Sequence, residues 1–82
     1  MTQAEIDQKE AATFDTKGLF VVLRRGRPSA KLRKLTVTLT FTEARLRFFK
    51  AAEMMRQGSV ILIGPDNQIL EYDCAPMVRT RW

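Results

Sequence analysis

Hydrophobic residues fall into short runs separated by turn residues, and these runs predict β-strands. Residues 19–23 (Leu-Phe-Val-Val-Leu) and 60–63 (Val-Ile-Leu-Ile) are continuously apolar, which is typical of strands covered on both faces. Residues 64–67 (Gly-Pro-Asp-Asn) have turn chemistry, and residues 69–73 return as a partner strand. We therefore expect the two continuous runs to form the middle of a sheet.

Residues 35–41 show the strictest alternation in the chain. Threonines lie on one side of this segment, and the apolar residues on the other side are Leu35, Val37, Leu39 and Phe41. A period of two predicts a strand with its apolar side buried and its threonine side in water, at an edge of the sheet. This strand would pair with residues 19–23 as a hairpin whose loop is basic.

Residues 42–57 predict the main helix. Thr42 is suited to be its N-cap, Glu43 suits the first turn, Phe41 can staple onto Leu46, and Gly58 is a good stop. At about 100° per residue, the face expected to lie on the sheet collects Ala44, Phe48, Ala51, Ala52 and Met55.

Two large apolar residues of this helix, Leu46 and Phe49, fall on its outer side. We expect them to pack under the N-terminal segment, and the alternative is a surface for self-association or for a protein partner. In the N-terminal segment, residues 2–13, Thr2 and Glu5 have the spacing of a capping box. This segment predicts either a short helix or a frayed tail.

The fold class that follows is α+β, with the element order β-β-α-β-β. A four-stranded antiparallel sheet in the order 2-1-3-4 satisfies the rule of right-handed crossovers and places the helix on one face. The other face then needs the N-terminal segment, a second subunit or a ligand. We divide the chain into an acidic tail or short helix (1–17), a single α+β domain (18–75) and a basic C-terminal tail (76–82).

Charge is concentrated in one part of the chain. The formal net charge is +5, and half of the 14 lysines and arginines lie within residues 17–34, which contain no acidic residue. Such clustering is the usual electrostatic footprint of a polyanionic partner. A loop that is merely soluble would normally mix both signs.

Residues 25–28, Arg-Gly-Arg-Pro, are the most specific string in the sequence. They resemble the core of the AT-hook, a short DNA-binding motif whose Arg-Gly-Arg lies along the narrow minor groove of A·T-rich DNA. The resemblance implies that Gly26 allows close approach to the groove floor while Arg25 and Arg27 extend along it. The alternative is an ordinary solvated turn, because glycine, proline and arginine are common in turns.

Further cations could contact phosphates beside this motif. The candidates within the loop are Arg24, Lys31, Arg33 and Lys34, and the helix could extend the patch through Arg45 and Arg56. We favour DNA over RNA, because the threonine side of residues 35–41 offers no aromatic platform for single-stranded bases. The sequence thus predicts a small basic nucleic-acid-binding module.

The chemistry that the sequence lacks argues against catalysis. It has no histidine, one cysteine (Cys74) and no Gly-rich phosphate loop. We therefore expect no enzyme activity, no metal site and no cofactor. The apolar runs are too short to span a bilayer, and no signal peptide is recognisable. We expect a cytoplasmic protein that does not bind membranes.

The competing hypothesis is a protein-interaction module, such as an inhibitor or an assembly protein of the kind that phages and plasmids encode. Leu46, Phe49, an open sheet face and an edge strand would form its surface, and a homodimer is one form of such an interaction. In this hypothesis the acidic N-terminus pairs with the basic loop of another subunit, or masks its own loop.

Overall fold

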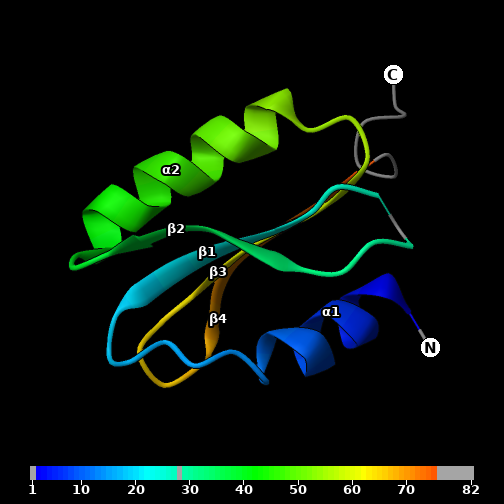
Figure 1. Cartoon of the computed structure of the whole chain (residues 1–82). Coiled ribbons are helices and arrows are strands. Elements are labelled where there is room, and N and C mark those ends of the chain that lie inside the picture. Colours follow the sequence, from blue (N-terminus) through cyan, green and yellow to red (C-terminus); the bar gives the residue numbers. More distant parts are fainter. Residues whose placement is uncertain (1, 28, 76–82) are drawn as a thin grey trace.

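The fold was obtained as a computed structural model, which describes residues 2–27 and 29–75. Its elements are, in chain order, α1 (Gln3–Ala11), β1 (Phe20–Arg25), β2 (Arg33–Thr38), α2 (Phe41–Met54), β3 (Gly58–Ile63) and β4 (Ile69–Ala75). The strands form one antiparallel sheet in the order β2-β1-β3-β4. The predicted α+β fold and its strand order are therefore confirmed (Figure 1).

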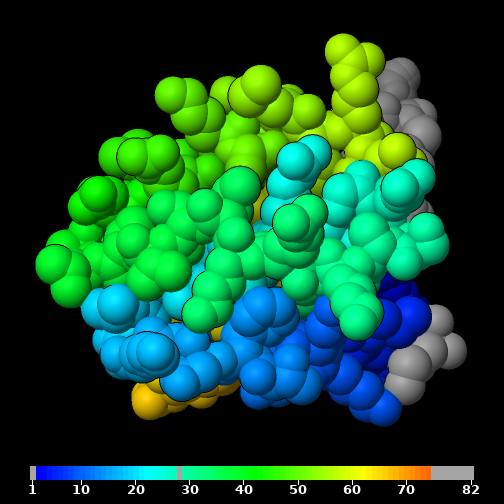
Figure 2. All heavy atoms as spheres, in the orientation of Figure 1, coloured from blue at the N-terminus to red at the C-terminus, as the bar shows by residue number. Residues whose placement is uncertain are grey.

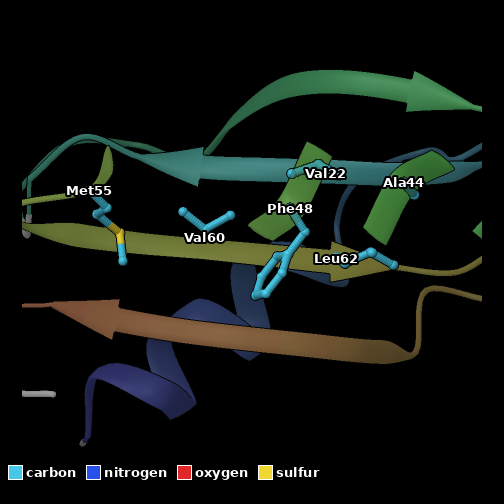
Figure 3. Close-up of a cluster of buried hydrophobic side chains, with 6 residues drawn as sticks. All are labelled: Val22, Ala44, Phe48, Met55, Val60 and Leu62. Carbon is cyan, nitrogen blue, oxygen red and sulfur yellow. The ribbon is translucent and has the colours of Figure 1, made fainter. Parts of the chain in front are cut away.

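The sheet lies between two helices, with α2 on one face and α1 on the other (Figure 1). The side chains between α2 and the sheet form one buried cluster, drawn in Figure 3: Val22, Ala44, Phe48, Met55, Val60 and Leu62. The opposite face holds a second buried cluster: Ala11, Val21, Leu23, Leu32, Ile61 and Ile63. The side chains of β1 and β3 point alternately into the two clusters, which explains why both strands are continuous apolar runs in the sequence.

The N-terminal segment is the helix α1, and it begins with the predicted capping box. The Thr2 hydroxyl accepts the Glu5 N–H, and the Glu5 carboxylate accepts the Thr2 N–H at 2.8 Å. Beyond the helix, the Asn67 amide donates to the Phe14 carbonyl at 2.7 Å. Asn67 also donates to the Ala11 carbonyl at 3.3 Å, and Ala11 is buried among sheet side chains, so the end of α1 is held on the sheet face that α2 leaves open.

The predicted limits of the main helix were wrong at both ends. Thr40, and not Thr42, is the N-cap, because its extended backbone lets its hydroxyl accept the Glu43 N–H, so Phe41 is already helical. The helix ends at Met54 and not at Gln57. Gly58 instead opens β3 with φ +92°, where a Cβ would lie 1.8 Å from the Arg25 carbonyl oxygen, so this close approach requires glycine.

The predicted burial of the alternating segment was also wrong. Leu39 is 80% exposed and Val37 is 44% exposed, whereas Thr38 is buried. Thr38 pairs with Phe20 and faces α2, while Val37 pairs with Val21 on the α1 side. Helix α1 packs mainly against β3 and not against the β2 edge, so Val37, on the α1 side of this edge strand, stays partly exposed to solvent.

The expectation that Leu46 and Phe49 pack under the N-terminal segment was wrong, because α1 covers the opposite face of the sheet. Leu46 is 67% exposed and Phe49 is about half exposed. The predicted basic tail, residues 76–82, lies outside the described residues. Among residues 2–27 and 29–75, no helix is long and apolar enough to cross a membrane.

Candidate nucleic-acid interface

Arg25 does not belong to the exposed loop but ends strand β1 with its side chain buried. The residue is 3% exposed, and its guanidinium contacts the carboxylates of Asp7 at 2.7 Å and Glu10 at 2.6 Å. It also donates to the Ala30 carbonyl. The alternation of β1 explains this position, because residues 21, 23 and 25 point to the α1 face.

Asp7 is the centre of this buried polar cluster. Its fully buried carboxylate accepts hydrogen bonds from Arg25 at 2.9 Å, Ser59 at 2.6 Å, Tyr72 at 2.7 Å and Gln3 at 3.1 Å. Burial by itself raises the pKa of Asp7, but these donors outweigh it and hold that pKa below its usual 3.8. A buried carboxylate with four donors remains ionised and neutralises Arg25.

Glu10 connects the cluster to the basic loop. One carboxylate oxygen accepts from Arg25, and the other accepts the backbone N–H of Leu32 at 2.8 Å. Burial raises the pKa of Glu10, whereas the Leu32 N–H and Arg25 lower it, and the net shift is downward. Two acids of α1 therefore fix both sides of the loop that follows Arg25.

The expected role of Arg25 in a DNA groove does not fit this geometry. An arginine that is held by two carboxylates and closed off from solvent would have to leave its partners before it could reach DNA, at a cost of several kcal/mol. Gly26 and Arg27 are exposed. The Arg-Gly-Arg string thus contributes one solvent-facing arginine and one structural arginine.

The other loop cations predicted as phosphate contacts gather around one hollow. This hollow of about 540 Å³ is lined by Arg24, Gly26, Arg27, Ala30, Lys31, Arg33, Lys34, Leu35 and Gln57. Its five cationic residues are all exposed. The arrangement joins residues of β1, the loop, β2 and the segment before β3, and its described lining includes no acidic residue.

A second hollow of about 390 Å³ adjoins the first, because the two share Arg24 and Leu35. It lies between β2 and α2 and is lined by Arg24, Leu35, Thr36, Arg47, Lys50, Ala51 and Met54. A β-bulge opposite Val22 and Leu23 shifts the register of β2, so that the consecutive residues Leu35 and Thr36 both lie beside α2. In Figure 2, β2 and the loop (cyan to green) separate α2 above from α1 (blue) below.

Sequence reasoning missed Arg47 and Lys50 as members of this surface. They lie one helical turn apart on α2, and their spacing is a recognisable signal. The spacing alone does not place Arg47 and Lys50 on this surface, because the sequence does not show which side of α2 lies beside β2. Together, the cations that line the two hollows are Arg24, Arg27, Lys31, Arg33, Lys34, Arg47 and Lys50, which we call the cationic face.

The two helix cations that the sequence suggested are placed differently. The Arg45 guanidinium bonds Glu71 at 2.9 Å and lies 5.6 Å and 5.2 Å from the ring centres of Phe41 and Phe49. It therefore belongs to a neutralised aromatic cluster rather than to the cationic face. Arg56 is exposed and precedes Gln57 of the first hollow, but Arg56 itself lines neither hollow.

Residues of the type that bind metals do not gather in the described ranges 2–27 and 29–75, where no group of three or more histidine, cysteine or acidic residues could hold a metal ion. Cys74 is buried and lies 3.8 Å from the Ser59 hydroxyl. No protein-family model, curated protein or solved structure matches the chain. The functional argument therefore depends on the geometry of the cationic face.

Proposed function

We propose that this protein binds nucleic acid, with DNA favoured, through the cationic face. The observation that supports this proposal is the gathering of seven cationic side chains from four segments around two adjoining hollows, with no acid in their described lining. Asp7 and Glu10, two acids near the loop, are occupied by Arg25. Lys34 Nζ donates to the backbone carbonyl of Asp15 at 3.3 Å, which does not neutralise its charge. The remaining positive charge is open to a polyanion.

Phosphate contacts would supply most of the binding free energy. Each neutralised phosphate releases condensed counterions, so five to seven contacts predict a log–log salt slope between about −4.5 and about −6.3. Sequence preference should be weak, because phosphates carry no sequence information and the buried Arg25 cannot read a groove. An A·T-rich and a G·C-rich duplex should therefore bind with similar affinity.

The test is a titration of labelled A·T-rich and G·C-rich duplexes at low and near-physiological salt. The double variant Arg27→Gln/Lys31→Gln should bind more weakly and lower the salt slope by about 2. The control, Lys9→Gln/Lys17→Gln, removes the same charge from exposed positions outside the two hollows and should bind almost normally. Absence of binding at low salt to both duplexes and to a single strand would refute the proposal.

A second candidate function, binding of a protein partner, has its own supporting observation. Phe41, Leu46 and Phe49 are exposed around Arg45, which Glu71 holds in place. An arginine preorganised between aromatic rings resembles the anchors that dominate protein interfaces. Association through this cluster, with another protein or with a second copy, should survive moderate salt and should be weakened by Leu46→Gln but not by Arg27→Gln.

A further inference from the structure

The second hollow differs from the first in having an apolar lining as well as cations. Leu35 is 48% exposed and Met54 is 75% exposed, and Ala51 is half-buried against the core under α2. Arg24, Arg47 and Lys50 line the same hollow and are exposed. A ligand that fits all of this lining must be both anionic and apolar.

A DNA duplex satisfies only half of these requirements. Its outer surface presents phosphates and sugars, and the faces of its bases are stacked inside. Against such a surface the three cations would find phosphates, while Leu35 and Met54 would be left without an apolar partner. A single strand differs, because an unstacked base offers an apolar face within one nucleotide of the phosphate.

We infer that the hollow between β2 and α2 accepts an unstacked base of single-stranded nucleic acid. The inference rests on the proposed function and defines its substrate more closely. The base would pack on Leu35 and Met54, whose thioether makes favourable contacts with aromatic rings, and the flanking phosphates would lie at Arg47 and Lys50. The Thr36 hydroxyl and the Arg24 guanidinium are donors in the same hollow for a base edge.

The adjoining hollows give such a strand a continuous path. They share Arg24 and Leu35, so a strand whose base enters the second hollow continues over Arg24 toward Arg27 and Lys31 in the first. The first hollow is lined mainly by cationic and polar residues, which suits backbone contact, and the second supplies the contact to a base. This division predicts that bases add affinity through the second hollow.

Comparison of two oligonucleotides with equal charge isolates this contact. One probe is a labelled oligothymidylate of about 12 nucleotides, a length within the range that small single-strand-binding folds occupy. The other is an abasic oligonucleotide with the same number of phosphates. Because both release the same counterions, a difference in affinity reports the bases alone. We expect the oligothymidylate to bind about fivefold to tenfold more tightly.

The variant Met54→Gln tests whether the second hollow causes that difference. Met54 is largely exposed, so the substitution should leave the fold intact, and it removes apolar contact without changing charge. It should abolish most of the preference for the oligothymidylate. Leu39→Gln is the matched control, because Leu39 is an apolar residue of similar exposure that lies outside both hollows, and its loss should leave the preference unchanged.

Failure of this inference is distinguishable from failure of the proposed function. If both oligonucleotides bind equally, and Arg27→Gln/Lys31→Gln weakens both, the cationic face binds backbones and the base contact is refuted. A preference for the oligothymidylate that Met54→Gln leaves intact also refutes the assigned hollow. If neither probe nor duplex binds at low salt, the proposed function fails and the inference fails with it.

Discussion

Arg25 and Arg27 are two residues apart in one short string, yet they occupy opposite environments. Arg25 ends a strand, is buried and contacts two carboxylates of α1. Arg27 lies beyond the strand, is exposed and lines a hollow with four other cations. The difference arises from where β1 ends, because the last inward position of the strand falls on Arg25.

The comparison shows that two arginines of one cationic motif can have different roles, one in stabilising the fold and one on the exposed surface. Arg25 binds Asp7, Glu10 and the Ala30 carbonyl, and thereby joins α1 to both ends of the loop. Helix α1 buries only one apolar side chain, Ala11, so this polar cluster is a main part of its attachment. Arg25 thus supports the loop that carries Arg27, the other arginine of the Arg-Gly-Arg string.

The largest expected effect is on stability, from removal of Arg25. Arg25→Ala leaves Asp7 buried without its cation, so the free energy of unfolding should fall by about 3–5 kcal/mol. Arg27→Ala should change it by less than about 0.5 kcal/mol, because Arg27 is exposed. Urea unfolding of both variants measures the contrast, and equal small losses would contradict it.

A smaller loss is expected from Tyr72→Phe, which removes one donor to Asp7 and keeps the ring. A hydrogen bond to a charged group contributes about 1.5–3 kcal/mol, and the free energy of unfolding should fall by that amount. Thr13→Val, which removes an exposed hydroxyl that bonds only the Glu10 carbonyl among the described contacts, is a control with little expected effect. Full stability of Tyr72→Phe would mean that the buried Asp7 does not depend on the Tyr72 hydroxyl.

Acid should weaken the buried cluster before it affects the cationic face. The folded-state pKa values of Asp7 and Glu10 lie below 3.8 and 4.5, so their contribution to stability is complete above about pH 4.5 and is lost as the pH falls through the lowered values. Glu10→Gln should therefore flatten the loss of stability on acidification. Asp66→Asn, in the exposed turn between β3 and β4, should retain the slope of the unsubstituted protein. Identical slopes for all three would contradict the assigned cause.

The smallest expected effect is on affinity, from removal of Arg27 alone. Arg27→Gln should weaken duplex binding by about fivefold and lower the salt slope by about 1, which corresponds to loss of one phosphate contact. Its free energy of unfolding should remain unchanged, so the two arginines give opposite results in the two assays. Lys9→Gln, measured in the same titration, should change neither quantity appreciably. Unchanged binding by Arg27→Gln would remove Arg27 from the interface.

Sequence patterns predicted the sheet because its central strands are determined by local apolar runs. The order β2-β1-β3-β4 followed from the contrast between runs covered on both faces and an alternating edge segment. The side of the edge strand that is buried could not be predicted in the same way. It depends on a bulge opposite Val22 and Leu23 and on a helix that does not reach the edge, both of which are tertiary features.

The candidate site was also predicted only in part, because some of its residues are brought together by tertiary packing and not by local sequence. The exposed loop cations are adjacent in sequence and could be grouped from charge alone, whereas Arg47 and Lys50 join them only through the packing of α2 beside β2. The burial of Arg25 had a readable signal, because inward positions 21 and 23 continue to 25. Charge alone suggested that the acidic N-terminus could pair with the basic loop, but no local pattern identified Asp7 and Glu10 as the partners of Arg25.

The most direct test of the different roles of the two arginines is an NMR titration that follows arginine side-chain Nε–H signals as DNA is added. Arg25 Nε donates to Asp7 at 2.9 Å in a closed site, so its signal should be protected from solvent exchange and should not move. The Arg27 signal, with those of Arg24 and Arg33, should shift progressively with DNA. A shift of Arg25 as large as that of Arg27, or unmoved signals from all the exposed arginines, would contradict the account.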